Sequence, residues 1–180
     1  FIGRGQSSVL LDCKPTKPQA QFLFKNRSYA SVFLPNGDLI IGDMGQLYRY
    51  RADEQSPPAP MLPRSVAPVY AISYLQDGTL LIGTDGEGLY LFRDGALLQV
   101  PGTRGLIINH LHLKGTTAWA ATNEGVWQFS FEDRLSAGVV DRVFTTDQGL
   151  PTIEVQAVAV VDNKLYAATG KGLAQIDFTE

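Results

Sequence analysis

Two histidines, His110 and His112, are the only imidazoles in the chain, and their spacing could begin a metal site. Residues i and i+2 of a β-strand project to the same face, so the two rings would lie side by side. Zinc sites usually need at least three protein ligands, and no third ligand is evident nearby. We therefore expect no metal here and interpret the pair as hydrogen-bonding groups between neighbouring repeats.

Two glycine-rich segments superficially resemble phosphate-binding loops: 83–88 (GTDGEG) and 169–172 (TGKG). A phosphate loop opens a helix and is followed by Lys-Ser or Lys-Thr. Both segments instead join two apolar strand-like runs. We expect neither to bind phosphate, and the sequence predicts no cofactor.

Four carboxylates on predicted turns are the remaining candidates for acid–base chemistry: Asp85, Glu87, Glu124 and Glu154. Charged turn residues are usually only solvated, and no Ser/His/Asp set with a nucleophile-elbow signature accompanies them. We expect no catalytic residues and no enzyme activity. The sequon Asn26-Arg27-Ser28 is interpreted as a chance occurrence.

The composition of the chain limits the classes of partner that it is expected to bind. The 180 residues are 44% hydrophobic and 18% charged, which is typical of a globular protein. A net charge of −3 without any Lys/Arg block argues against nucleic acid. No apolar run approaches the roughly 20 residues of a membrane span, so no direct membrane insertion is expected in this segment. The single cysteine, Cys13, excludes an intramolecular disulfide, and we interpret it as a partly buried residue at a strand end.

An internal repeat provides the elements that would position these side chains. Each copy has an apolar strand, a small residue, an anchor that is mostly Thr, a turn that usually contains Gly, and a second strand. The anchors recur at about 40 residues, the size of one four-stranded propeller blade. The copies lie at residues 1–12, 39–50, 80–92, 118–129 and 165–176, with anchors at Arg4, Asp43, Thr84, Thr122 and Thr169.

The predicted fold class is all-β: four-stranded antiparallel propeller blades in an incomplete propeller. The expected divisions of this single region are a partial blade at 1–26, blades at 27–65, 66–104 and 105–150, and a blade at 151–180 that lacks its outer strand. Fourth strands are expected at residues 21–24, 61–62, 97–100 and 140–144. Gly42 and Gly83 are expected where packing between blades leaves no room for a side chain, with Ala121 and Ala168 at the same position in later copies.

The chain begins inside a second strand and ends just after a third, which favours an open fragment of a larger propeller. In the alternative, residues 21–24 supply an outer strand to the last blade and close a ring of about four blades. An open arc would leave apolar blade faces exposed, and these could mediate self-association.

In a propeller, the loops that enter strand one and the loops joining strands two and three share one face. Aromatic, amide and charged side chains there suit a carbohydrate or another polar small ligand. The predicted ligand-binding residues are Tyr29, Tyr70, Arg104, Asn109, His110 and Glu154, and Asp85, Glu87, Asn123, Glu124 and Lys171 share their face.

The last repeats resemble a known family. Residues 144–151 (FTTDQGLP) lead into 155–158 (VQAV), then 164–169 (KLYAAT) and Gly172-Leu173. These words resemble the two-component regulator propeller repeat, with its GLP loop, "lWigT" strand and "Gl..fd" strand. Residues 80–84 (LLIGT) and 118–122 (AWAAT) are similar, and Trp119 falls in the family's Trp position. Asp43 and the missing Trp of the other copies depart from the pattern.

The resemblance implies a periplasmic, ligand-sensing or scaffold propeller of a bacterial two-component receptor, in a parent protein anchored in the inner membrane. Two other functions are kept open. One is a propeller enzyme, such as a polysaccharide lyase or glycosidase, and the other is a structural protein-interaction propeller.

Overall fold

The computed structural model describes residues 2–4, 7–12, 19–24, 26–51, 58–131 and 137–178. Apart from one 3-10 helix, Thr146–Gln148, all its regular elements are β-strands. They form five separate antiparallel sheets, which we number in chain order. The all-β fold class is confirmed.

The first sheet has three strands, β1 (Ile2–Arg4), β2 (Ser7–Asp12) and β3 (Gln19–Phe24). The three middle sheets each have four strands in sequential order. They are β4 (Ala30–Phe33), β5 (Leu39–Gly42), β6 (Leu47–Tyr50) and β7 (Ala59–Pro60); β8 (Val69–Tyr74), β9 (Leu80–Thr84), β10 (Leu89–Arg93) and β11 (Ala96–Gln99); and β12 (Ile108–Lys114), β13 (Thr117–Thr122), β14 (Gly125–Ser130) and β15 (Val139–Phe144). The fifth sheet has β16 (Val155–Val161), β17 (Lys164–Thr169) and β18 (Gly172–Asp177).

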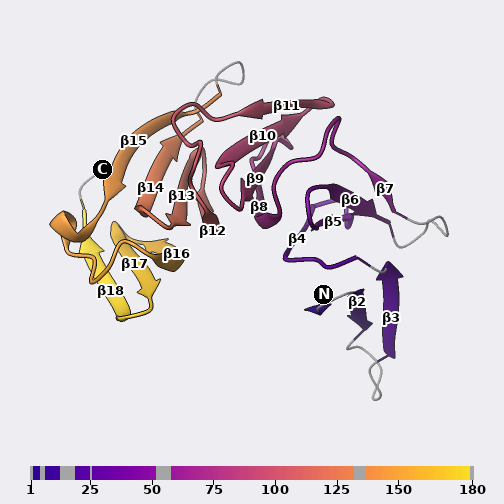
Figure 1. Ribbon diagram of the computed structural model, residues 1–180, viewed down its shortest axis with the longest axis horizontal. Coiled ribbons are helices and arrows are strands. Elements are labelled where there is room, and N and C mark those ends of the chain that lie inside the picture. Colours follow the sequence, from indigo (N-terminus) through magenta and orange to yellow (C-terminus); the bar gives the residue numbers. More distant parts are fainter. Residues whose placement is uncertain are drawn as a thin grey trace.

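The sheets follow one another along an open arc (Figure 1). Strands β4, β8, β12 and β16 line its inner side, and β7, β11 and β15 lie on the outer side. β8 contacts both β4 and β12, and β12 also contacts β16. This arrangement of radial sheets around an inner row of strands is that of an incomplete β-propeller.

Contacts between successive sheets, which we call seams, are built on a small residue facing a β-branched one. A Cβ added to Gly42 would lie 2.6 Å from Cγ1 of Val69, and one added to Gly83 would lie 2.5 Å from Cγ2 of Ile108. Both partners begin the inner strand of the next sheet and are fully buried. The prediction that these glycines mark close packing between blades is confirmed.

The anchor residue ties strand two to the turn that follows it. The hydroxyl of Thr84 donates to the Gly88 carbonyl at 2.7 Å, and that of Thr122 to the Gly125 carbonyl at 2.9 Å. Asp43 has no hydroxyl in this position, and its Oδ1 accepts from the backbone N–H groups of Gly45 and Gln46, at 3.1 and 2.8 Å. Thr122 likewise accepts from the Glu124 N–H at 2.9 Å, so Asp43 keeps the accepting bond of the anchor and lacks only the hydroxyl that donates.

The GLP segment is the connection into the fifth sheet. A capping box between Thr145 and Gln148 frames the 3-10 helix, and Gly149 ends it with a φ of 101°, a left-handed conformation that suits glycine. Leu150 is buried with Val155 and Phe178 in the apolar cluster between the fourth and fifth sheets. The loop thus fixes where β16 begins.

Two expectations are corrected. The closed-ring alternative is wrong, because β3 pairs with β2 in its own sheet, at the opposite end of the arc from β18 (Figure 1). The fourth strand of the second sheet was expected at Met61 and Leu62 but is β7, Ala59–Pro60. An edge strand tolerates a proline because its outward N–H needs no partner.

Candidate functional site

A β-bulge recurs at the start of the inner strands. In the third sheet Val69 pairs with Thr84 and Ala71 with Gly83, so that Tyr70 is the extra residue. The same shift leaves Asn109 unpaired in β12 and Gln156 in β16. Bulges re-aim side chains and are over-represented beside functional sites. Tyr29, immediately before β4, holds the corresponding place in the second sheet.

The structure brings Tyr29 and Tyr70 together. Their ring centroids are 5.1 Å apart at an interplanar angle of 60°, and they come from neighbouring sheets. Tyr29 is exposed and Tyr70 is half-buried. The pair therefore presents aromatic surface to solvent at the bulged end of the inner strands.

Polar groups hold the tyrosine pair in place. The Tyr70 hydroxyl donates to Oδ2 of Asp85 at 2.9 Å, and this hydrogen bond, aided by partial burial, raises the pKa of Tyr70 above its usual value. Nη1 of Arg27 donates to the Tyr29 hydroxyl at 3.3 Å, which in turn donates to Sδ of Met44 at 3.1 Å. Tyr70 therefore stays protonated at neutral pH and remains a donor to Asp85.

Asn109 and His110 have a different role from the tyrosines, because both reach across to the next sheet. Nδ2 of Asn109 donates to the Val155 carbonyl at 2.8 Å, and Nδ1 of His110 accepts from the Val158 N–H at 3.4 Å. These bonds satisfy backbone groups of β16, whose inner edge pairs with no other strand among the described residues. The interpretation of the histidines as hydrogen-bonding groups between repeats fits this geometry.

The surroundings of the histidine pair favour neutral imidazoles. Desolvation against β16 lowers the pKa of both His110 and His112. The ring of His112 also lies 5.9 Å from that of Trp119. Across the described ranges, no group of three or more His, Cys, Asp or Glu side chains is placed to hold a metal ion.

The other two predicted ligand residues, Arg104 and Glu154, lie on the loops that enter β12 and β16, and both are exposed. Each of these loops contacts the turn between strands two and three of the preceding sheet. Gly105 N–H donates to the Gly86 carbonyl at 3.1 Å, and Gly125 N–H donates to the Ile153 carbonyl at 2.7 Å. They share the face of the bulged residues, but no hydrogen bond or ion pair joins either to the tyrosine pair in the described structure.

The turn carboxylates do not converge. Asp85 is engaged by Tyr70, whereas Glu87 accepts a hydrogen bond from the Tyr90 hydroxyl at 2.8 Å. The sequon residue Asn26 donates from Nδ2 to Oδ2 of Asp43 at 3.0 Å. Asp85, Glu87 and Asn26 therefore each have a hydrogen-bond partner in the protein.

Three residues of this face were missed from the sequence. Arg27 and Met44 join the tyrosines only through the fold, and no sequence pattern links them. Gln156 could have been found, because aligning the start of β16 with those of β8 and β12 places it with Tyr70 and Asn109. Gln156 is exposed and adds an amide to the face.

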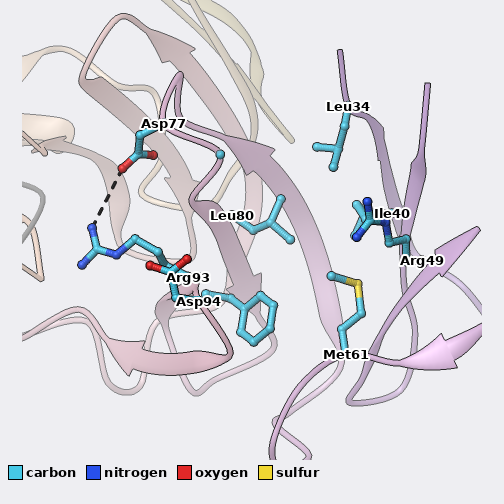
Figure 2. A pocket seen from close by; sticks show the side chains of 10 residues that line it. Leu34, Ile40, Arg49, Met61, Asp77, Leu80, Arg93 and Asp94 are labelled. Atoms are coloured by element: carbon cyan, nitrogen blue, oxygen red, sulfur yellow. Dashed lines mark ion pairs between the residues drawn. The ribbon is translucent and has the colours of Figure 1, made fainter. Parts of the chain in front are cut away.

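A separate cavity of about 170 Å³ lies between the second and third sheets at the other end of the inner strands (Figure 2). Arg49 and Met61 face it from one side, and Asp77, Leu80 and Arg93 from the other. Arg93 lies 3.9 Å from Asp77, and Arg49 forms an ion pair with Asp38. Because its arginines pair with the protein's own aspartates, we assign no ligand to this cavity.

The fold and the bulged face together define the class: an incomplete β-propeller with an aromatic–polar surface at one end of its inner strands. No family model and no curated protein matches the chain. No helix in the described part is long and apolar enough to cross a membrane.

Solved β-propeller structures do match. The extracellular domain of BT4673 from B. thetaiotaomicron, named a hybrid two component system, is 16% identical with a TM-score of 0.70, over 90% of this chain and 24% of that chain. The WD40 β-propeller domain of Doa1 is 15% identical with a TM-score of 0.75, over 98% of this chain and 60% of that one. PorZ, a surface component of the type-IX secretion system of Porphyromonas gingivalis, is 16% identical with a TM-score of 0.68, over 94% and 29%. These likenesses show the fold, and the chain spans about a quarter of the BT4673 domain.

Proposed function

We propose that this chain is part of an extracytoplasmic, ligand-sensing propeller of a bacterial two-component receptor, and that it binds a carbohydrate or similar polar ligand at the bulged face. The observation that carries the proposal is the Tyr29–Tyr70 pair, in which Tyr29 is exposed and Tyr70 half-buried, and which Asp85 and Arg27 orient. Aromatic rings with polar groups at their edge suit the mixed apolar and hydroxyl surface of a sugar.

Two further points support this proposal. The words GLP, LLIGT and AWAAT resemble the two-component regulator propeller repeat, and the fold is like that of an extracellular domain named for such a system. The place of the domain is proposed on the same grounds: the periplasm, in a parent anchored in the inner membrane. Because the carboxylates of this face do not converge, we propose binding without catalysis.

Replacing Tyr29 by alanine should weaken ligand binding about tenfold or more, the loss expected when an aromatic anchor is removed. The measurement is isothermal titration calorimetry with a panel of neutral and acidic oligosaccharides. Phe33→Ala is the matched control, because Phe33 is an exposed aromatic residue at the other end of β4. It should leave the affinity unchanged.

A finer variant tests the Tyr70–Asp85 bond without removing a ring. Tyr70→Phe removes only the hydroxyl that donates to Asp85. Tyr74→Phe is the control, because it removes a tyrosine hydroxyl elsewhere on β8. Failure of the whole panel to bind, or binding that is indifferent to Tyr29→Ala and Tyr70→Phe, would overturn the proposed function.

A further inference from the structure

The face of the fifth sheet that points away from the fourth sheet exposes a residue. Each preceding four-stranded sheet buries the equivalent residue. Leu173, on β18, is 73% exposed, whereas Leu47, Leu89 and Val126 are 0% exposed. These four residues are equivalent, because each pairs with the strand-two residue just before the anchor. Those partners are Gly42, Gly83, Ala121 and Ala168. Leu173 is therefore an apolar residue in a seam position, but no further sheet covers it in the described structure.

The rest of this face also matches the seams. Ala168 repeats the small residue that receives Val69 at Gly42 and Ile108 at Gly83. Tyr166, two residues earlier on β17, is half-buried, but its counterpart Trp119 on β13 is only 2% exposed. This face therefore has a large apolar residue, a small residue and a second apolar residue at Tyr166, Ala168 and Leu173. The same pattern occurs on the faces that already pack against a further blade.

The turn provides a third point of match. Gly88 N–H donates to the Leu106 carbonyl at 3.0 Å, and Gly125 N–H donates to the Ile153 carbonyl at 2.7 Å. Each acceptor lies two residues before the β-branched residue of the next inner strand, Ile108 or Val155. Gly172 occupies the equivalent position beside Thr169, with a φ of 116°.

We propose that the face formed by Tyr166, Ala168 and Leu173 docks one further propeller blade, whose inner strand starts with a β-branched residue. That residue fills the space above Ala168, and the carbonyl two positions before it accepts from Gly172. The proposal rests on continuity with the three existing seams, all of which bury the residue equivalent to Leu173 and two of which also have the turn hydrogen bond. It does not depend on the ligand proposed for the bulged face.

The test extends the chain after Glu180 with a second copy of residues 134–178, which supplies a fourth strand (139–144) and then Ile153 and Val155 in the required spacing. Leu173→Cys in a Cys13→Ser background reports coverage through its reaction with a disulfide reagent. Thiol labelling should be about tenfold slower or more in the extended chain, because a covered thiol is inaccessible. Val155→Asp in the added copy should restore fast labelling, and Phe33→Cys should label fast throughout.

Equal labelling of Leu173→Cys with and without the added blade would overturn the proposal. Slow labelling in the unextended chain that depends on protein concentration would also overturn it, because a second copy would then be the occupant. A second measurement needs no added blade: Leu173→Lys should leave the unfolding midpoint of the dilute chain unchanged, whereas Leu89→Lys should lower it strongly. Equal loss in both would show that the face is already covered.

Discussion

Replacing Gly83 by alanine should lower the free energy of unfolding by about 2–3 kcal/mol, although only one methyl group is added. The new Cβ would lie 2.5 Å from Cγ2 and 2.7 Å from Cβ of Ile108, and these branched atoms cannot rotate away. Backbone of the third or fourth sheet must therefore shift. Urea denaturation followed by circular dichroism measures the loss.

Two controls separate this clash from a general effect of the substitution. Gly170→Ala adds the same methyl group where nothing lies within 4 Å and φ is not positive, so it should change stability by less than about 0.5 kcal/mol. Ile108→Ala removes Cγ2, the atom nearest the new methyl group, so combining it with Gly83→Ala should cost less than the sum of the two single losses. Additive effects of the two changes would contradict the seam geometry.

Phe129→Ala should lower the free energy of unfolding by about 3–5 kcal/mol, the largest loss expected for a single change. Phe129 is 0% exposed, in the apolar cluster shared by the third and fourth sheets. Its ring stacks between Trp127 and Phe131, with centroids at 6.2 and 6.3 Å. Truncation removes apolar burial and leaves a cavity that the flanking rings only partly fill.

Phe33→Ala is the control for this variant too, because Phe33 is exposed and should cost less than about 0.5 kcal/mol. Urea unfolding of both variants measures the difference. Similar losses would mean that the seam between the third and fourth sheets is not a packed core.

The fold could be predicted from the sequence because each repeat contains the small residue on which a seam is built. A strand that ends in a small residue and then Thr recurs at blade length, and Gly83 could be assigned to close packing before Ile108 was known to face it. The fourth strand of the second sheet was misplaced because Met61 and Leu62 are the apolar residues there, while Pro60 argues against a strand unless it lies at an edge.

The candidate site was harder to predict. Sequence reasoning put Tyr29, Tyr70 and Asn109 on one face, because strand starts share an end of the propeller. It could not show the bulges, because one extra residue does not disturb an apolar run of this length. Nor could it separate the tyrosine pair, which faces solvent, from Asn109 and His110, which bind the backbone of β16.

The chain is an open arc in which no described strand pairs with the outer edge of β18. Amide hydrogen exchange in dilute solution tests this arrangement most directly by comparing strand three in three sheets. β10 and β14 pair on both sides, whereas β18 pairs only with β17 among the described residues. The outward amides of β18 should exchange nearly as fast as those of an unstructured peptide, while those of β10 and β14 stay protected. Equal protection of all three strands would contradict the open arc.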